Sequence, residues 1–197
     1  MLPLRIESQY FGSISYIKQI VQSNNVVIDV HEPFKKMSNR NRTMIVSAQG
    51  PLLLTVPLQE GRDQKKSMKD VQICNQHNWP IKHLKAISSC YKRSPFFEYY
   101  ELELQRLFTI KYDRLIDFNK ASIDFVMQSL RIKKEIQQLG DNTIEVNKEA
   151  IDWRLEQQRD FAQKPYYQLF ENKNGFLPNL SSLDLIFNEG NLAVDFL

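Results

Sequence analysis

Short apolar runs and one helical repeat dominate the first thirty residues of the chain. Leu2–Ile6 is an apolar run typical of a buried strand, and Val26–Val30 is a second run, rich in β-branched residues. Between them, isoleucines and a valine recur at helical spacing from Ile14 to Val21. A strand, a helix and a strand joined by a crossover of this length favour two parallel strands in a right-handed βαβ unit.

The next part of the chain has the pattern of a β-hairpin. Thr43–Ala48 and Leu52–Pro57 are β-rich runs on either side of a turn that contains a glycine and a proline. The three leucines at 52–54 predict core positions in a strand that is buried on both faces. After a charged segment, Val71–Cys74 predicts one more short strand.

From residue 78 onward the spacing of apolar residues becomes helical. Pro80 lies where a helix beginning at Trp79 tolerates proline, and Ser94–Pro95 predicts the start of another helix. Tyr112–Leu139 predicts one long amphipathic helix that ends at Gly140. A short strand is expected at Asn142–Val146.

The last predicted helix begins near Ser181, which has capping-box spacing to Asp184. The chain shows no internal repeat, low-complexity stretch or linker. We therefore predict a single domain over residues 1–197, of the α/β class, with a small parallel or mixed sheet, flanking helices and a helical second half.

Composition and charge exclude several classes of protein. The 197 residues are 42% hydrophobic and carry 26 Lys and Arg against 23 Asp and Glu, a net charge of +3. This composition excludes a disordered tail, and the small positive excess argues against a nucleic-acid partner. No apolar run is long enough to span a membrane and no secretory leader is recognisable, so we expect no membrane partner. Two cysteines without CxxC spacing favour the reducing cytoplasm.

The local positive charge is concentrated in one predicted loop. Lys35, Lys36, Arg40 and Arg42 are four cations within eight residues, with no acid among them. Guanidinium groups bind phosphate or carboxylate with two parallel hydrogen bonds, and the Asn41 amide can complete the coordination. The loop is therefore interpreted either as an anion clamp or as a solvated basic loop.

Residues that follow the two predicted parallel strands are candidates for the rest of a site, because ligands meet the carboxyl edge of such a sheet. Gln9, Tyr10 and Tyr16 come after the first strand, and the two aromatic rings suit a sugar or a base, although core packing is an equally ordinary role. His31 comes after the second strand. It is a candidate general base, or a structural histidine at a strand end.

A further candidate wall of an anion pocket lies in Trp79–His83, where Lys82 and His83 are one turn beyond the indole and Lys92–Arg93 adds charge. The alternative is a helix whose tryptophan is in the core and whose cations face water. The chain has no zinc-ligand spacing and no nucleotide-binding glycine loop, so no metal and no cofactor are expected.

Several segments in a fixed order give the chain a family likeness. They are Gln9–Tyr16, Asp29–Glu32, Ser38–Arg42, Gly50–Pro57, Trp79–His83, Tyr91–Phe97, Tyr112–Asp113 and Phe176–Gly190. Together they resemble the WbqC-like protein family, from about Ile6 to the C-terminus. The resemblance implies a bacterial cytoplasmic protein associated with building surface polysaccharides such as O-antigen.

With this family context, the leading hypothesis is an enzyme that transfers an acyl or aminoacyl group onto a nucleotide-linked amino sugar. Lys36, Arg40 and Arg42 would hold the pyrophosphate, the tyrosines would contact the sugar, and His31 would remove a proton from the attacking amine. The alternative is a non-catalytic module that binds a phosphorylated sugar for a partner enzyme. The apolar run Leu192–Leu197 suits docking on the body of the protein or on a second copy in a homodimer.

Overall fold

The predicted pair of parallel strands forms the centre of the main sheet. The structure, a computed structural model, describes residues 3–139, 151–152 and 163–197. Strand β1 (Leu4–Ile6) pairs in parallel with β2 (Val26–Asp29), and helix α1 (Ile14–Gln22) is the crossover between them, which confirms the βαβ prediction. The carboxyl ends of β1 and β2 therefore meet at one edge of the sheet.

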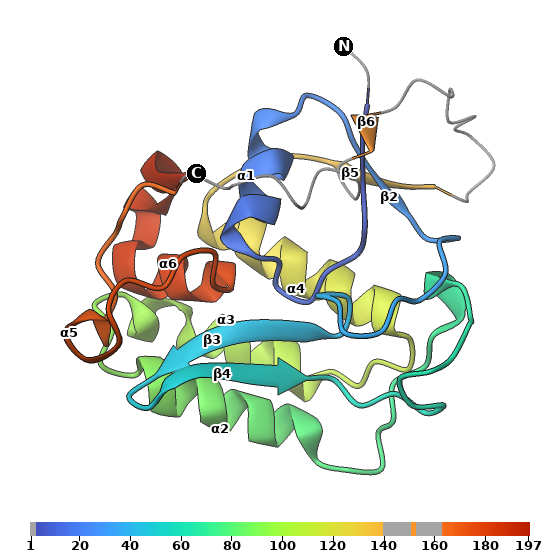
Figure 1. Cartoon of the computed structure of the whole chain (residues 1–197), viewed down its shortest axis with the longest axis horizontal. Coiled ribbons are helices and arrows are strands. Elements are labelled where there is room, and N and C mark those ends of the chain that lie inside the picture. Colours follow the sequence, from blue (N-terminus) through green and yellow to red (C-terminus); the bar gives the residue numbers. More distant parts are fainter. Residues whose placement is uncertain (1–2, 140–150, 153–162) are drawn as a thin grey trace.

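Two strands from much later in the chain complete this sheet. β5 (Ile136–Leu139) lies beside β2, and the two-residue strand β6 (Ile151–Asp152) lies beside β1, so that the order is β5-β2-β1-β6 with every pairing parallel. All four strands are short, and α1 packs beside them (Figure 1).

The long helix predicted over Tyr112–Leu139 is wrong in its last part. Helix α4 covers only Leu115–Ser129, and the chain then turns at Arg131, whose φ of +57° is left-handed. The Ile132 amide donates to the Met127 carbonyl at 2.9 Å and closes the helix end. The segment after this turn joins β2 as strand β5, which gives its backbone groups partners in the sheet. The strand predicted at 142–146 lies outside the described residues.

The β-hairpin is confirmed, with a shifted turn. β3 (Arg42–Ser47) and β4 (Gly50–Thr55) are antiparallel, and Ser47 pairs with Gly50, so the glycine and proline belong to the strand. Burial of the leucines on both faces is wrong: Leu54 is 5% exposed and Leu53 is 43% exposed. The hairpin packs one face on the body of the protein, where α2 and α6 contact β3, and its other face is at the surface.

Val71–Cys74, which the structure describes, does not form the expected strand. A 3₁₀ turn, η1 (Met68–Asp70), precedes it, and the segment then makes only isolated bridges, including one from Ile73 to Leu58. Val71 and Ile73 are nevertheless fully buried. The alternation of apolar residues therefore reports burial in the core and not membership of a sheet.

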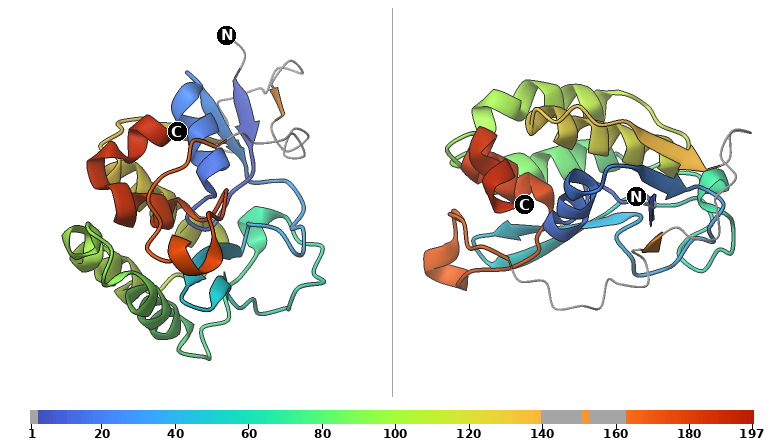
Figure 2. Two further views of the ribbon diagram at one scale, coloured as in Figure 1. Left: turned by 60° about the vertical axis from the view of Figure 1, so that its left-hand side comes forward. Right: turned by 90° about the horizontal axis from the view of Figure 1, so that it is seen from above.

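Helices cover one side of the strands and fill the second half of the chain, which confirms the predicted α/β class. Helices α2, α3 and α4 lie together on one side, and the hairpin and α1 lie on the other (Figure 2). The remaining helical elements, not counting α1 and α4 given above, have the following bounds: α2 (Trp79–Tyr91), α3 (Phe97–Thr109), α5 (Glu171–Asn174), α6 (Ser182–Glu189) and the 3₁₀ segment η3 (Gly190–Phe196).

The start of α6 differs from a capping box. Ser181 does cap the helix, because its side chain accepts from the Leu183 amide. The Ser181 amide, however, donates to the Met44 carbonyl on β3, and the Asp184 carboxylate accepts from the Tyr166 hydroxyl at 2.5 Å instead of turning back. Burial raises the pKa of Asp184 to about 6. The reciprocal bond is replaced by contacts that hold α6 on the hairpin and on the segment before α5.

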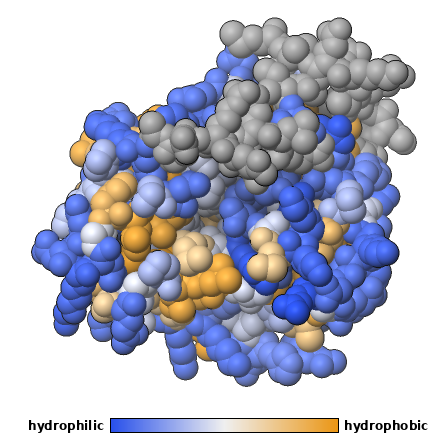
Figure 3. All heavy atoms as spheres, in the orientation of Figure 1, coloured by the Kyte–Doolittle hydropathy of each residue, from blue (hydrophilic) through white to orange (hydrophobic). Residues whose placement is uncertain are grey.

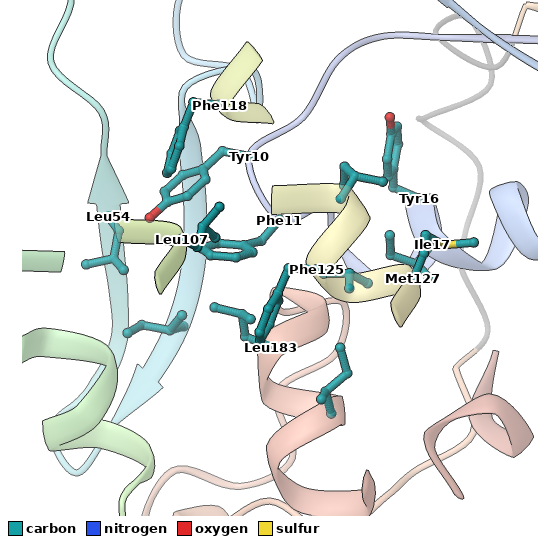
Figure 4. Close-up of a cluster of buried hydrophobic side chains, with 14 of the residues drawn as sticks. Tyr10, Phe11, Tyr16, Ile17, Leu54, Leu107, Phe118, Phe125, Met127 and Leu183 are labelled. Atoms are coloured by element: carbon teal, nitrogen blue, oxygen red, sulfur yellow. The ribbon is translucent and has the colours of Figure 1, made fainter. Parts of the chain in front are cut away.

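Aromatic residues of the turn after β1 lie in the core. The rings of Tyr10 and Phe11 are fully buried among side chains from α3, α4, α6 and β4 (Figure 4). Gly12 has a φ of +64°, and a Cβ there would lie 2.7 Å from Tyr16 Cδ1, so the turn requires glycine. The close approach lets α1 pack directly against this cluster.

The surface is mostly hydrophilic. Figure 3 shows an apolar area on the side of α6 and the hairpin, with hydrophilic side chains around it. Within η3, Ala193 is buried while Leu192 is 54% exposed, so the C-terminal run docks in part on the body of the chain. No helix in the described part of the chain is both long enough and apolar enough to cross a lipid bilayer.

The two faces of β4 provide a stability test. We expect Leu54→Ala to lower the free energy of unfolding by about 2–5 kcal/mol, because it opens a cavity in the core. Leu53→Ala, at the neighbouring exposed position, should cost less than about 1 kcal/mol. Urea denaturation of both variants measures the difference. Equal losses would show that the leucine run is buried on both faces after all.

Candidate functional site

A buried cluster of three charged side chains occupies the carboxyl edge of the sheet. Glu7 directly follows β1, Glu32 follows β2, and Arg40 comes from the loop that leads into β3. Arg40 Nε and Nη2 donate to the two carboxylate oxygens of Glu32 at 3.0 and 2.8 Å, and Nη1 lies 2.8 Å from Glu7 Oε2. All three side chains are about 95% buried. Arg40 therefore binds protein carboxylates and is not free to clamp a ligand, so that prediction is wrong.

Further hydrogen bonds fix this cluster to the elements around it. Gln9 Nε2 donates to Glu7 Oε1 at 2.9 Å, and the Tyr16 hydroxyl donates to the Glu7 carbonyl at 2.7 Å. Asn119 of α4 donates to the Arg40 carbonyl at 2.7 Å. Gln9 and Tyr16 are buried, and burial, then the Glu7 charge, raises the pKa of Tyr16. Both side chains hold the loops together, and neither is placed to contact a sugar.

Tyr10 and His83 form a second buried pair, behind the turn. The Tyr10 hydroxyl lies 3.0 Å from His83 Nδ1, and burial raises the pKa of Tyr10 and lowers the pKa of His83 to about 4. The imidazole is therefore neutral at pH 7 and adds no positive charge. Trp79 is 5% exposed and packs edge-on against His83 and Phe118. The predicted wall formed by Trp79 and His83 is part of the core.

The other predicted site residues do not lie together in the structure. They are Lys82, Lys36, Asn41 and His31. Lys82 and Lys36 are exposed, and the Lys36 ammonium lies 2.7 Å from Asp63 on the following loop. Asn41 is buried, and its side chain donates to the Val56 carbonyl at 3.0 Å, so it does not face a ligand. His31 is exposed just beyond β2, and its amide donates to Asp29 Oδ1 at 3.0 Å.

The basic loop and the aromatic turn do meet, at Arg42. A recess of about 40 Å³ lies where Arg42 and Asn39 face Tyr10, Ser13 and the segment 179–181. Arg42 Nε is buried and has no hydrogen-bond partner in the described part of the chain. A space of this size holds a few water molecules or one small anionic group. Arg42 is the cation of the predicted clamp that lies beside the turn after β1.

The amino end of α1, beside this recess, offers no free backbone donors. Such helix ends often bind phosphate. Here each of the first amides already has an acceptor: Ser13 N donates to Gln9 Oε1, Ile14 N to Leu180 O, Ser15 N to Asn179 Oδ1 and Tyr16 N to Ser13 Oγ. Any anion in the recess would therefore depend on side-chain donors.

The sequence interpretation missed a second basic region. Lys92 and Arg93 were grouped with Trp79, but they line a separate cavity of about 670 Å³ together with Lys85. Lys92 is the C-cap of α2 and Lys85 lies seven residues before it, a spacing that brings both residues to the same side of the helix. That spacing is the signal in the sequence that could have found the cavity. Among the described residues, no group of three His, Cys, Asp or Glu side chains could hold a metal ion.

Comparison with known proteins agrees with the resemblance drawn from the motifs. The model of the WbqC-like protein family matches residues 7–168. The chain therefore belongs to the WbqC-like family, although the match ends before the segment Phe176–Gly190. No curated protein and no solved structure gave a match.

The charged cluster predicts a large stability effect. Arg40→Ala should lower the free energy of unfolding by about 3–5 kcal/mol, because it leaves two carboxylates buried without their partner. Lys36 lies in the same loop as Arg40, and Lys36→Ala breaks its exposed ion pair with Asp63, which should cost about 1 kcal/mol or less. Chemical denaturation measures both. An Arg40 variant as stable as the Lys36 variant would contradict a structural role for the cluster.

Proposed function

We propose that this protein binds a phosphorylated, nucleotide-linked amino sugar during the building of bacterial surface polysaccharide, and that it transfers an acyl or aminoacyl group onto the sugar. Membership of the WbqC-like family fits a role related to polysaccharide biosynthesis. The observation that carries the binding step is the recess lined by Arg42, whose buried Nε has no hydrogen-bond partner among the described residues.

Arg42 is the predicted cation that suits this role best. Arg40 is held by two buried carboxylates and Lys36 lies beside Asp63, so both already have anionic partners. The recess fits one phosphoryl group and is too small for a sugar ring, which would therefore lie outside it. Ser13 and Ser181 line the same recess, and a serine hydroxyl can donate to a phosphate oxygen.

His31 is the group proposed for proton transfer. It is exposed at the carboxyl edge of the sheet, and the bond between its amide and Asp29 fixes its backbone. In the proposed reaction a bond forms between the sugar nitrogen and the acyl carbon, the bond from that carbon to the donor breaks, and His31 takes the proton from the amine. The amine attacks in its neutral form, and an imidazole nitrogen can accept the proton that it loses.

The binding step is tested with Arg42→Gln. Calorimetry with a panel of nucleotide-linked amino sugars should show affinity reduced about 10-fold to 100-fold, because a charged hydrogen-bond donor is lost. Arg62→Gln removes an exposed charge from another loop and serves as the control, with binding unchanged. Wild-type affinity in the Arg42 variant would contradict the proposed phosphate contact.

The transfer step is tested with His31→Ala. We expect the rate of transfer, measured with acyl-carrier donors, to fall about 10²-fold to 10⁴-fold with little change in sugar affinity. His77→Ala, another exposed histidine, should behave like the wild type. Binding without transfer in the wild type would instead support a module that presents the sugar to a partner enzyme.

A further inference from the structure

A cavity at the C-terminal end of α2 has the size of a small-molecule site. Its volume is about 670 Å³, within the range of about 300–1,000 Å³ in which small ligands are bound. Residues of α2 form one wall, and the turn of the hairpin, one residue of α3 and the segment before α5 form the others. Among the described residues, it shares no lining residue with the recess at Arg42.

The described charged residues that line this cavity are all cations. They are Lys85, Lys92 and Arg93, and none of the described lining residues is an aspartate or a glutamate. None of the three cations has an ion pair or a side-chain hydrogen bond within the described part of the chain, whereas Arg114 and Lys120 bind carboxylates on their own helix. Three cations around one concavity attract an anion more strongly than cations spread over a surface.

The neighbouring side chains do not offset this charge. Cys90 also lines the cavity, and burial, together with the nearby Asp184 carboxylate, raises the pKa of its thiol. The thiol therefore stays neutral at pH 7. The hydroxyls of Ser88 and Ser89 add hydrogen-bond donors on the same wall as Lys85 and Lys92.

A helix-stabilising role explains only part of the arrangement. Lys92 and Arg93 follow the last turn of α2, where cations interact favourably with the negative end of the helix dipole. Lys85 lies in the middle of α2, beyond the reach of that effect, yet it faces the same cavity. Its position is accounted for by the cavity and not by the helix end.

The uncharged part of the lining suits a planar ring. Leu84, Leu169 and Phe170 contribute apolar surface, and the ring of Phe170 is half-buried beside the cations. We propose that this cavity binds a nucleoside diphosphate group, with the phosphates against Lys85, Lys92 and Arg93 and the base against Phe170. The assignment does not depend on the function proposed for the recess at Arg42.

The first test measures binding of UDP and ADP by calorimetry. The double variant Lys92→Gln, Arg93→Gln should lower the affinity at least 10-fold, because two positive charges that face the phosphates are lost. Both side chains are exposed, so the core should stay intact. Arg62→Gln with Lys65→Gln removes the same charge from an exposed loop and should change nothing.

The second test asks whether the base is recognised. Phe170→Ala should weaken UDP about fivefold or more and leave inorganic pyrophosphate unaffected, because stacking on the ring is lost. Uridine without phosphates should bind far more weakly than UDP. A nucleotide-linked sugar that binds as well as UDP would show that the cavity also accepts the linked form.

The proposal is overturned by any of four results. These are no binding of either nucleotide, binding that is unchanged in the Lys92 and Arg93 double variant, pyrophosphate affinity equal to that of UDP, and tighter binding of single-stranded RNA or anionic lipid vesicles. The last result would assign the basic surface to a macromolecule or a membrane. Circular dichroism of each variant confirms that the comparison is between folded proteins.

Discussion

The arrangement of the loops depends on one buried ionic interaction. In it, the guanidinium of Arg40 is fixed between the carboxylates of Glu7 and Glu32. It joins the end of β1, the segment after β2 and the loop that enters the hairpin. The Arg40 carbonyl also accepts a hydrogen bond from the side chain of Asn119 on α4, in the helical layer. Charges this deeply buried are tolerated only when each has its partners. The sheet, the hairpin and α4 are therefore held in one geometry by a small set of polar contacts.

The same interaction decides where a ligand can bind. In parallel sheets the carboxyl edge is the usual ligand site. Here that edge is filled by protein charges, and the rings of Tyr10 and Tyr16 beside it are sealed in the core. Two concave regions lined by cationic side chains are the recess at Arg42 and the cavity beside α2. In this chain, buried charges occupy part of the carboxyl edge of the sheet, while His31 at the same edge is exposed.

Local patterns in the sequence predicted the elements whose stability is local. The β-branched runs and the spacing from Ile14 to Val21 predicted the βαβ unit, and Pro80 marked the start of α2. The patterns failed where a distant partner decides. The segment after Arg131 is a strand because β2 is available beside it. Likewise, Leu53 is exposed because nothing covers that face of the hairpin.

The candidate site was harder to predict than the fold, because charge in a sequence does not show which charges pair. Arg40 belongs to a run without acids, yet its partners lie 8 and 33 positions before it. Aromatic residues beside a strand end suit either a ligand or the core, and only packing distinguishes the two. His31 is exposed and Arg42 lines a recess, whereas the cavity beside α2 was missed although the spacing of Lys85 and Lys92 could have indicated it.

The order of the strands in the main sheet has a consequence for how the chain folds during its synthesis. Leu4 pairs with Val26 early in the chain, but its other neighbour is Ile151. As the polypeptide leaves the ribosome, one side of β1 must therefore wait without a partner until most of the chain has emerged. Pairings so distant along a chain slow folding, and an unpaired edge can associate with other chains. The first strand to be synthesised is among the last to be enclosed.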